Sequence, residues 1–332
     1  MLASLLAVSI ATAASARAGT LEMVRARGTL KCGVIGGLPG MSILDSRGEW
    51  TGFHVDLCRA MGAAVFGDPS KVTFVTVTGV TRFTAMQTGE IDVLESVTAL
   101  NVRRDFSLAL TLPVVAMYTG QGVLVGRKLA AASLQDLNGA TLCAVSGGEI
   151  EHNLADFATA HGINFNIVSY DADATLVSAL TAGRCDAASN DMLSLLANQA
   201  SLSDPAAFVL LPDLVAKEPH GPVVRADDLQ WATLMRWVVF ALVQAEELGL
   251  TRENVAERMQ TDQDPTVRRF LDNAMTGANE PNLQKGWTAK VVGTAGNYGE
   301  IYERTAGAQG LKLDRGLNRL WTKGGMMMSW LW

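Results

Sequence analysis

From residue 30 onward, short apolar runs alternate with longer stretches in which apolar positions recur every three or four residues. Runs closed by Gly, Pro or Asp predict buried strands, and the helical periodicity predicts amphipathic helices. We expect strands at 30–35, 72–77, 91–95, 141–145, 164–168 and 186–189, and helices at 54–66, 81–87, 151–160 and 172–182. Strands that alternate with helices of about ten residues indicate βαβ units and a mostly parallel sheet.

Two extended segments interrupt this alternation. Residues 110–125 form an apolar, β-rich run that Pro113 breaks, and residues 208–224 contain three prolines. The remainder is helical, with expected helices at 227–248, 251–260, 266–275 and 283–306. We therefore predict an α/β fold with two lobes, lobe 1 formed by residues 19–123 and 222–332 and lobe 2 by residues 124–221. Such lobes can close on a hinge around a ligand in the cleft between them.

The composition is that of a globular protein with a large core. Of the 332 residues, 48% are hydrophobic and 18% are charged, which excludes an intrinsically disordered chain. The formal net charge is −6, and basic residues occur in pairs such as Arg103-Arg104 instead of tracts. We therefore expect neither nucleic acid nor an anionic membrane as the main partner.

The N-terminal 18 residues have the pattern of a secretory signal peptide. An Ala-rich apolar run ends in Ala16-Arg17-Ala18, a small-x-small cleavage pattern. No Lys or Arg precedes the run, which leaves open a start upstream of Met1, and a frayed apolar N-terminus is the alternative. Cleavage would leave a chain that begins at Gly19 without a cysteine for lipid attachment, so we expect a protein free in the periplasm. The later apolar stretch 231–245 carries Arg236 and is shorter than the ~18 residues of a membrane span.

Four cysteines in an exported protein predict two disulfides, for which three connectivities are possible. Cys32 lies in the first predicted strand and Cys58 on the first predicted helix, whereas Cys143 and Cys185 lie in strands of the middle third. We predict the pairs Cys32–Cys58 and Cys143–Cys185, one in each lobe. A zinc site is the weaker alternative, because no two cysteines have the short spacing typical of such sites.

The residues that follow the predicted strand 91–95 indicate a ligand site. This stretch crosses small and hydroxyl residues and ends on Arg103 and Arg104. Ligands of open α/β sheets bind at the carboxyl ends of strands, and a guanidinium can hold a carboxylate through two parallel hydrogen bonds. The alternative is a solvated, basic start of a helix, since arginine is mostly a surface residue.

Many short motifs, none decisive alone, occur in one characteristic order. They are Lys31-Cys32-Gly33-Val34, Gly37-Leu38-Pro39-Gly40, Trp50-Thr51-Gly52-Phe53-His54-Val55-Asp56, Ala63-Ala64-Val65-Phe66-Gly67-Asp68, Ala182-Gly183-Arg184-Cys185-Asp186, Lys217-Glu218-Pro219, Gln230-Trp231, Ala245-Glu246-Glu247-Leu248-Gly249 and Gly296-Asn297-Tyr298-Gly299-Glu300. Over residues 20–325 the chain thereby resembles the extracytoplasmic solute-binding proteins of polar amino-acid ABC transporters (family 3), and within them the general L-amino-acid-binding branch.

The resemblance implies a type II periplasmic binding protein, in which two crossing hinge strands join the lobes. It also implies a non-catalytic protein that captures an amino acid by lobe closure and delivers it to a membrane permease and its ATPase. No cofactor and no metal are implied, and we expect a monomer located in the periplasm.

The resemblance further implies the roles of two charged residues. Arg104 is expected to hold the α-carboxylate of the ligand, and Asp191, just past strand 186–189, is expected to accept the α-ammonium from the other lobe. Closure would then desolvate both pairs only when a zwitterion lies between the lobes. A helix N-cap is the alternative for Asp191, because an apolar helix follows it. The other expected cleft residues are Leu38, Val97, Thr98, Ala99, Gly148 and Glu149.

Several positions depart from the family's pattern. Ala99 lacks the hydroxyl that relatives use for the carboxylate, and Glu149 replaces a cleft threonine. His54 replaces an acidic residue, Met41 a phenylalanine, and residues 326–332 a proline-containing ending. Either the site is retuned toward another side chain or zwitterion, or the gene is drifting and affinity is reduced. Because a lost hydrogen bond to a charged group costs roughly 1.5–3 kcal/mol, we predict weaker binding of simple neutral amino acids than in typical relatives.

Two other classes of function are weighed against transport. An exported dehydratase-like enzyme on the same fold could use Glu149 as a general acid. A receptor sensor domain is disfavoured, because the sequence shows no transmembrane segment or signalling domain. No Ser/His/Asp set, metal motif or phosphate loop is present in the sequence, and the histidines are expected to be surface or packing residues without ligand spacing: His54, His152, His161 and His220.

Overall fold

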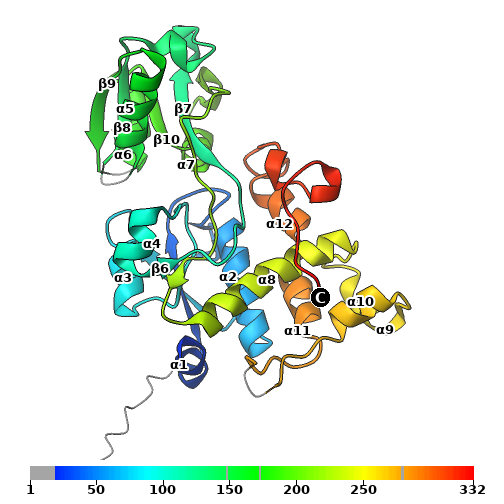
Figure 1. Cartoon of the computed structure of the whole chain (residues 1–332). Helices are drawn as coiled ribbons and strands as arrows, with labels where there is room; N and C mark the ends of the chain where they lie inside the picture. The colour runs from blue at the N-terminus through cyan, green and yellow to red at the C-terminus, as the bar shows by residue number, and fades with distance from the viewer. Residues whose placement is uncertain (1–18, 147–148, 172, 278–279) are drawn as a thin grey trace, which may run out of the picture.

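The computed structural model describes residues 19–146, 149–171, 173–277 and 280–332, and the predicted signal peptide lies outside the described residues. Two α/β lobes are stacked, and helices of the C-terminal third pack beside the lower lobe (Figure 1). The predicted two-lobe α/β fold is confirmed. Within these ranges no helix combines the length and the apolar character needed to cross a bilayer.

Strand β1 (Leu30–Ile35) is the centre of the sheet in lobe 1. It pairs in parallel with β4 (Val72–Val77) on one side and with β5 (Val93–Leu94) on the other. This parallel arrangement requires helical crossovers between the strands. The other elements of this part are the hairpin β2 (Ile43–Leu44) and β3 (Trp50–Thr51), and the helices α1 (Thr20–Arg27), α2 (Phe53–Phe66), α3 (Arg82–Thr88) and α4 (Val102–Leu108).

The sheet of lobe 2 is mixed, with strand order β11-β7-β10-β8-β9. Its strands are β7 (Gly120–Gly126), β8 (Thr141–Val145), β9 (Asn166–Tyr170), β10 (Ala187–Asp191) and β11 (Phe208–Leu210), with β12 (Ala216–Lys217) also paired to β7. Its helices are α5 (Ile150–His161), α6 (Asp173–Thr181) and α7 (Met192–Ala200), and its short 3₁₀ turns are η1 (Arg127–Leu129), η2 (Leu134–Leu137) and η3 (Pro205–Ala207). Strands β10, β8 and β9 run parallel, as the βαβ pattern predicts.

Each lobe contains one disulfide, and both predicted pairings are present. Cys32 of β1 is linked to Cys58 of α2, with 6.2 Å between their Cα atoms. Cys143 of β8 is linked to Cys185, just before β10, with 5.8 Å between their Cα atoms. The bonds close loops of 26 and 42 residues and so restrict the unfolded chain.

Two antiparallel segments connect the lobes. In lobe 1, β6 (Leu110–Thr111) pairs with β13 (Val224–Arg225), and in lobe 2 β12 pairs with β7. Between these pairs the backbone of His220 bonds to that of Met117, so the segments stay side by side as they cross. The lobe limits at residues 123 and 221 stay a prediction, and β7 already belongs to the sheet of lobe 2 from Gly120 onward.

The C-terminal third is helical, but the predicted helix 283–306 is wrong as a single element. It is two helices, α11 (Trp287–Ala295) and α12 (Tyr298–Thr305). Gly296 lies between them with a φ of 83°, a conformation that favours glycine and ends the first helix. Asn297 and Glu300 then form a capping box that starts the second. The remaining elements here are α8 (Leu229–Glu247), α9 (Val255–Thr261), α10 (Pro265–Leu271), η4 (Gly316–Asn318) and η5 (Trp321–Lys323).

Two strands of lobe 2 are displaced from their predicted ranges. Strand β9 is shifted by two residues from the predicted 164–168, because it pairs with β8 from Asn166 onward. Strand β10 extends to Asp191 instead of ending at 189, since Asp191 still pairs with Gln121 of β7. Helix α1 was not among the expected elements.

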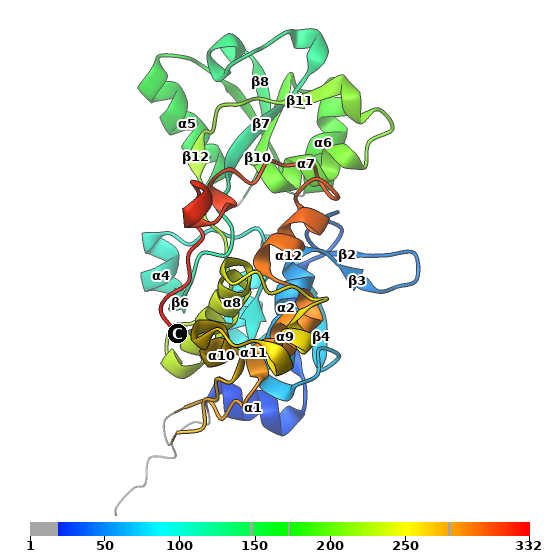
Figure 2. The same cartoon turned by 90° about the vertical axis from the view of Figure 1, so that its right-hand side faces the viewer.

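The C-terminal tail packs on lobe 1 through aromatic rings. The ring of Trp332 lies 5.1, 4.9 and 5.7 Å from those of Trp237, Phe270 and Trp287. Upstream of the tail, the side-chain amide of Asn318 accepts from the Tyr118 N–H at 2.7 Å and donates to the Tyr118 carbonyl at 2.9 Å. The segment after α12 therefore reaches the level where the lobes meet (Figure 2).

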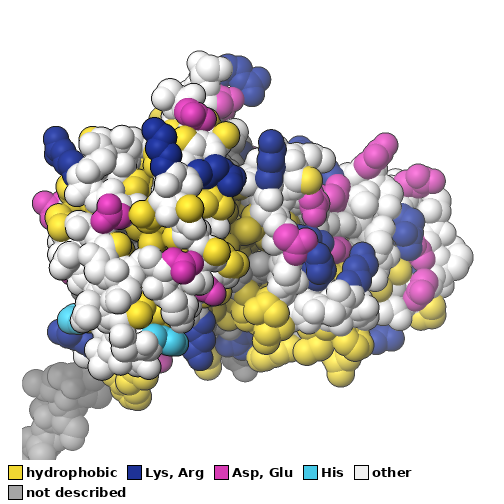
Figure 3. Space-filling view, turned by 90° about the horizontal axis from the view of Figure 1, so that it is seen from above, with side chains coloured by type: hydrophobic (Ala, Val, Ile, Leu, Met, Phe, Trp, Pro, Cys, Tyr) yellow, Lys and Arg dark blue, Asp and Glu magenta, His cyan; other side chains and the backbone are white. Residues whose placement is uncertain are grey.

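The surface agrees with the absence of long basic tracts in the sequence. On the face seen from above, basic and acidic side chains are interspersed, and hydrophobic side chains gather at one edge (Figure 3). The tail itself exposes Met326, Met328, Trp330 and Leu331. Mixed charge of this kind gives no electrostatic footprint for a nucleic acid on that face.

Candidate ligand-binding cleft

A cavity of about 510 Å³ lies between the two lobes. Seven of the eight expected ligand-binding residues line it: Leu38, Val97, Thr98, Ala99, Arg104, Glu149 and Asp191. The eighth, Gly148, lies outside the described residues. The structure brings the expected residues of both lobes to one cavity, while their part in ligand binding stays a prediction.

Arg104 reaches the cavity from the first turn of α4. The side-chain oxygen of Asn101 caps this helix by accepting the Arg104 N–H at 2.9 Å. The guanidinium donates to the Ala99 carbonyl at 2.7 Å, and its Cζ lies 5.1 Å from the centre of the Phe83 ring. Both partners are neutral, so the positive charge is held in place without being neutralised. Arg103, by contrast, is exposed.

The charge on Arg104 is balanced at a distance. Burial lowers the pKa of Arg104, and the carboxylates of Glu149 and Glu218 act in the opposite direction. A guanidinium nevertheless stays protonated in proteins at neutral pH. The cavity therefore presents a fixed cation to a ligand's carboxylate.

Asp191 lies at the end of β10 and at the start of α7, so it has the N-cap role that was weighed as an alternative. Its Oδ1 accepts the N–H groups of Leu193 and Ser194 at 2.9 and 3.2 Å. Its Oδ2 accepts the hydroxyl of Thr119 at 3.3 Å. Capping uses one carboxylate oxygen and leaves the charge of the group in place, so the cap and a ligand role are compatible.

In the stretch before Arg104, the Thr98 hydroxyl is occupied by another side chain, and Ala99 offers a backbone carbonyl. The Thr98 hydroxyl is buried and bonds to that of Ser96 at 2.7 Å. Ala99 contributes its carbonyl to the Arg104 guanidinium. Ala99 therefore lacks the hydroxyl of the family's pattern but still positions the arginine through its carbonyl.

Glu149 makes a contact across the cleft. Its Oε1 accepts a hydrogen bond from the side-chain amide of Asn101 at 3.0 Å. Asn101 belongs to the lobe 1 sequence and Glu149 stands at the N-terminus of α5 in lobe 2. The residue that caps the Arg104 helix thus also links the two lobes, and Glu149 has a protein partner.

Two other departures from the family's pattern do not line the cavity. Met41 is fully buried in the core of lobe 1. His54 is buried on α2, and burial lowers its pKa to about 3. Both are packing residues. Among these departures from the family's pattern, Ala99 and Glu149 are the ones that line the cavity.

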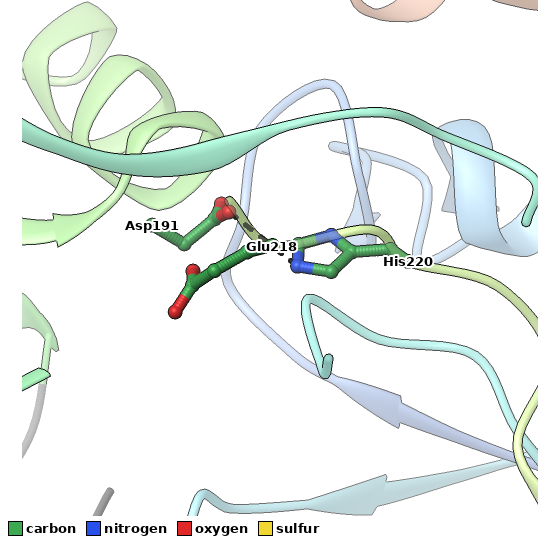
Figure 4. Close-up of side chains that lie close together, drawn as sticks. All are labelled: Asp191, Glu218 and His220. Carbon is green, nitrogen blue, oxygen red and sulfur yellow. Dashed lines mark ion pairs between the residues drawn. The ribbon is translucent and has the colours of Figure 1, made fainter. Parts of the chain in front are cut away.

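The expected list of site residues did not include Glu218, which lines the cavity. It follows β12 on the returning crossing segment, and its only sequence signal is the motif Lys217-Glu218-Pro219. His220, two residues on, is buried, and its Nε2 lies 3.5 Å from Oδ2 of Asp191 (Figure 4). Burial lowers the pKa of His220 to about 3, with His54 and Arg82 acting in the same direction, so the imidazole is neutral at neutral pH.

Ligand atoms of Asp191, Glu218 and His220 all lie within 4.8 Å of one another. Two carboxylates and an imidazole are donors that a transition metal accepts. The same three residues can also bind a cationic nitrogen. An ammonium group has N–H donors and no acceptor, so it can donate to both carboxylates. His152 and His161 are exposed and lie outside this group.

Two lobes joined by crossing segments, with a polar cavity between them and opposite charges on its two sides, define a solute-binding protein. Residues 30–253 match the model of the bacterial extracellular solute-binding proteins, family 3. The chain belongs to this family, as the motifs indicated.

Named relatives are similar over nearly the whole chain. The general L-amino acid-binding periplasmic protein AapJ of Rhizobium johnstonii is 41% identical over 97% of this chain and 95% of its own length. The glutamate/glutamine/aspartate/asparagine-binding protein BztA of Rhodobacter capsulatus is 41% identical over 97% of this chain and 96% of its own. A solved periplasmic binding protein from Brucella ovis with glutathione bound is 40% identical, with a TM-score of 0.90 over 95% of this chain and 99% of the other.

These likenesses confirm three predictions. The protein is a binding protein and not an enzyme, it belongs to the transport class, and it is periplasmic. The dehydratase alternative finds no support, since the similar chains carry the names of binding proteins and Glu149 is bonded to Asn101.

Proposed function

We propose that the protein captures an L-amino acid between its lobes and delivers it to the permease and ATPase of an ABC transporter. The observation that carries the proposal is the placement of opposite charges on opposite sides of one cavity, Arg104 from lobe 1 and Asp191 from lobe 2. A zwitterion complements both, and closure strengthens both interactions by excluding water. One chain supplies both charges, so the proposed active form is a monomer with lobes 19–123 plus 222–332 and 124–221.

The names of two relatives support the proposal. AapJ is named as a general L-amino acid-binding protein, and BztA as a binding protein for glutamate, glutamine, aspartate and asparagine. In both cases the ligand carries an α-ammonium and an α-carboxylate. Arg104, Asp191, Thr98, the Ala99 backbone and Glu149 are the residues we assign to the ligand.

A second candidate ligand is a small peptide of the glutathione type. The similar Brucella ovis protein holds glutathione, and the cavity of about 510 Å³ falls in the range of sites for ligands larger than one amino acid. Glutathione has a free α-amino acid group at its γ-glutamyl end. The same pair, Arg104 and Asp191, would therefore bind the head of either ligand.

A thermal-shift screen of the twenty amino acids and reduced glutathione tests the proposal. A bound ligand at a hundredfold excess over its Kd stabilises the protein by about 2.7 kcal/mol, which raises Tm by several degrees. We expect at least one L-amino acid or glutathione to raise Tm, and its D-enantiomer or the free side-chain analogue to have no effect. No shift with any of these compounds would contradict the proposed function, and tight binding of glutamine or leucine would contradict the predicted weakness for neutral amino acids.

A further inference from the structure

The acidic side of the cleft contains a second carboxylate. Glu218 lies on the returning crossing segment, where its N–H donates to the Thr119 carbonyl at 2.9 Å. Its carboxylate approaches that of Asp191, and both line the cavity (Figure 4). Within the described ranges neither carboxylate forms an ion pair with a lysine or arginine, and the only basic side chain at ion-pair distance of Asp191 is the neutral His220.

Two neighbouring carboxylates in a partly dry site repel each other, and a proton takes the place of a missing cation. Burial raises the pKa of Asp191 well above its usual value, and the Glu218 carboxylate raises it further. Burial raises the pKa of Glu218 to about 7 despite the opposing effect of Arg104 and Arg82. The ligand-free pair therefore shares a proton near neutral pH, as interacting carboxylates do.

The other charged groups around the pair are fixed. Arg104 from α4 and Arg82 from α3 act on Glu218 as cations, and His220 on the same segment stays neutral. Glu149 acts on Arg104 from the other lobe. Arg104 and Arg82 stay cationic and His220 stays neutral at neutral pH, so we assign a change in charge near pH 7 to the carboxylate pair.

We propose that Glu218 is a second ammonium-binding carboxylate beside Asp191, and that the ligand's ammonium group displaces a proton from this pair when it binds. The inference rests on the proposed function. The ammonium donates its N–H groups to Oδ2 of Asp191 and to the Glu218 carboxylate, and the displaced proton passes to the solvent. The O–H bond of the protonated carboxyl breaks, water takes up the proton, and no other covalent bond changes.

An ammonium group suits these three residues better than a metal ion does. A metal-bound histidine normally donates its second ring N–H to an acceptor that fixes the ring, but Nδ1 of His220 has no hydrogen-bond partner among the described residues. Oδ1 of Asp191 is already used by two backbone N–H groups. The oxygens that remain, one from Asp191 and those of Glu218, fit a compact donor with three N–H bonds.

The selective consequence concerns ligand charge. A ligand without a cationic nitrogen leaves the shared proton in place and gains nothing from Glu218. A ligand with an ammonium group gains two charge-assisted contacts on one side of the cleft. Glu218 thus discriminates between amino acids and simple carboxylic acids, even though both can be held by Arg104.

Isothermal titration calorimetry of the full chain tests this with L-glutamine and reduced glutathione as probes. Titrations near pH 6 and near pH 8, each in buffers of different ionisation enthalpy, give the number of protons released. For the wild type we expect release of about one proton near pH 6 and almost none near pH 8, with Kd rising up to about tenfold per pH unit below pH 7. Glu218→Gln should bind about ten- to a hundredfold more weakly near pH 8 and should release fewer protons than the wild type near pH 6.

Two controls separate the possible outcomes. Glu253→Gln removes an exposed carboxylate outside the cavity lining and should behave as the wild type. Circular dichroism and Tm show whether Glu218→Gln is folded, which we expect because the change removes one of two repelling charges.

The outcomes that overturn the inference differ from those that overturn the proposed function. Binding without proton release, or a Glu218→Gln variant with unchanged affinity, contradicts the ammonium role of Glu218 and leaves amino-acid binding intact. No binding of either probe at either pH contradicts the ammonium role of Glu218, and the proposed function is contradicted as well if no compound of the thermal-shift screen raises Tm. Titration with ZnCl₂ alone that shows binding in the wild type and none in His220→Phe would assign the three residues to a metal instead.

Discussion

The two sides of the cleft hold charge in different ways. On the cationic side, the Arg104 guanidinium is fixed by a carbonyl and an aromatic ring, and Arg82 of α3 also lines the cavity. On the opposite side, Asp191 is anchored by two backbone N–H groups and stands next to Glu218. The difference teaches that the two cations come from separate helices, α4 and α3, whereas the two carboxylates lie close enough to repel each other.

Removal of the Arg104 guanidinium should have the largest effect. Arg104→Ala deletes two charge-assisted hydrogen bonds to the ligand's carboxylate, each worth roughly 1.5–3 kcal/mol. We expect a loss of affinity of about a hundredfold or more by calorimetry, with the fold intact. Arg103→Ala is the matched control, because the neighbouring guanidinium is exposed and should be dispensable. Binding that survives Arg104→Ala within tenfold would show that the two sides are not organised in this way.

On the anionic side, two substitutions of Asp191 separate charge from capping. Asp191→Asn keeps an oxygen that accepts from the α7 N–H groups but removes the charge, so affinity should fall about ten- to a hundredfold while Tm changes little. Asp191→Ala loses the cap as well, and should also lose about 1 kcal/mol of stability. Calorimetry and thermal unfolding of both variants check this. Equal Tm values for the two variants would show that the Asp191 side chain does not stabilise the protein as the N-cap of α7.

The hydrogen bond between Asn101 and Glu149 can be broken without a change to Arg104 or Asp191. Asn101→Asp retains a good N-cap for α4 but places a second carboxylate opposite Glu149. We expect closure to become less favourable and affinity to drop about threefold, as for a partly exposed pair. The double change Asn101→Asp with Glu149→Gln should restore affinity. A single variant with wild-type affinity would show that the contact does not contribute to closure.

The last expected effect is measured on the ligand-free protein. Because burial raises the pKa of Glu218 from 4.5 to about 7, the folded state holds this proton more tightly than the unfolded chain does. The associated stability is present below about pH 4.5 and is lost as the pH rises to about 7. Tm of the wild type should therefore fall relative to that of Glu218→Gln over this range. Parallel curves for the two proteins would argue against a shared proton.

Local patterns predicted the lobes well and their junction poorly. The apolar runs that became β1, β4 and β8 can be identified from a few neighbouring residues, and one cysteine of each disulfide lies on them, Cys32 on β1 and Cys143 on β8. The pair Arg103-Arg104 was noted because it follows a strand, and the family resemblance singled out Arg104. The helix break at Gly296 and the shift of β9 depend on cap geometry and on pairing with a partner strand.

The site residues that the sequence did not indicate are brought in by long-range contacts. Glu218 and His220 reach Asp191 only because the returning segment crosses beside the outgoing one. Asn101 bonds to Glu149 from 48 positions away, and Asn318 bonds to Tyr118 from 200 positions away. Periodicity within ten or twenty residues cannot predict contacts between residues so far apart in the sequence. The motif Lys217-Glu218-Pro219 marks Glu218 but does not indicate that it reaches Asp191.

The aromatic packing of the tail has a consequence for spectroscopy. All seven tryptophans lie outside residues 124–221, and none lines the cavity: Trp50, Trp231, Trp237, Trp287, Trp321, Trp330 and Trp332. Three of them, Trp237, Trp287 and Trp332, form one cluster. The intrinsic emission of the protein is therefore that of one lobe, with little sensitivity to the ligand. An indole introduced by Tyr170→Trp, at the end of β9, would give the moving lobe an optical signal of its own.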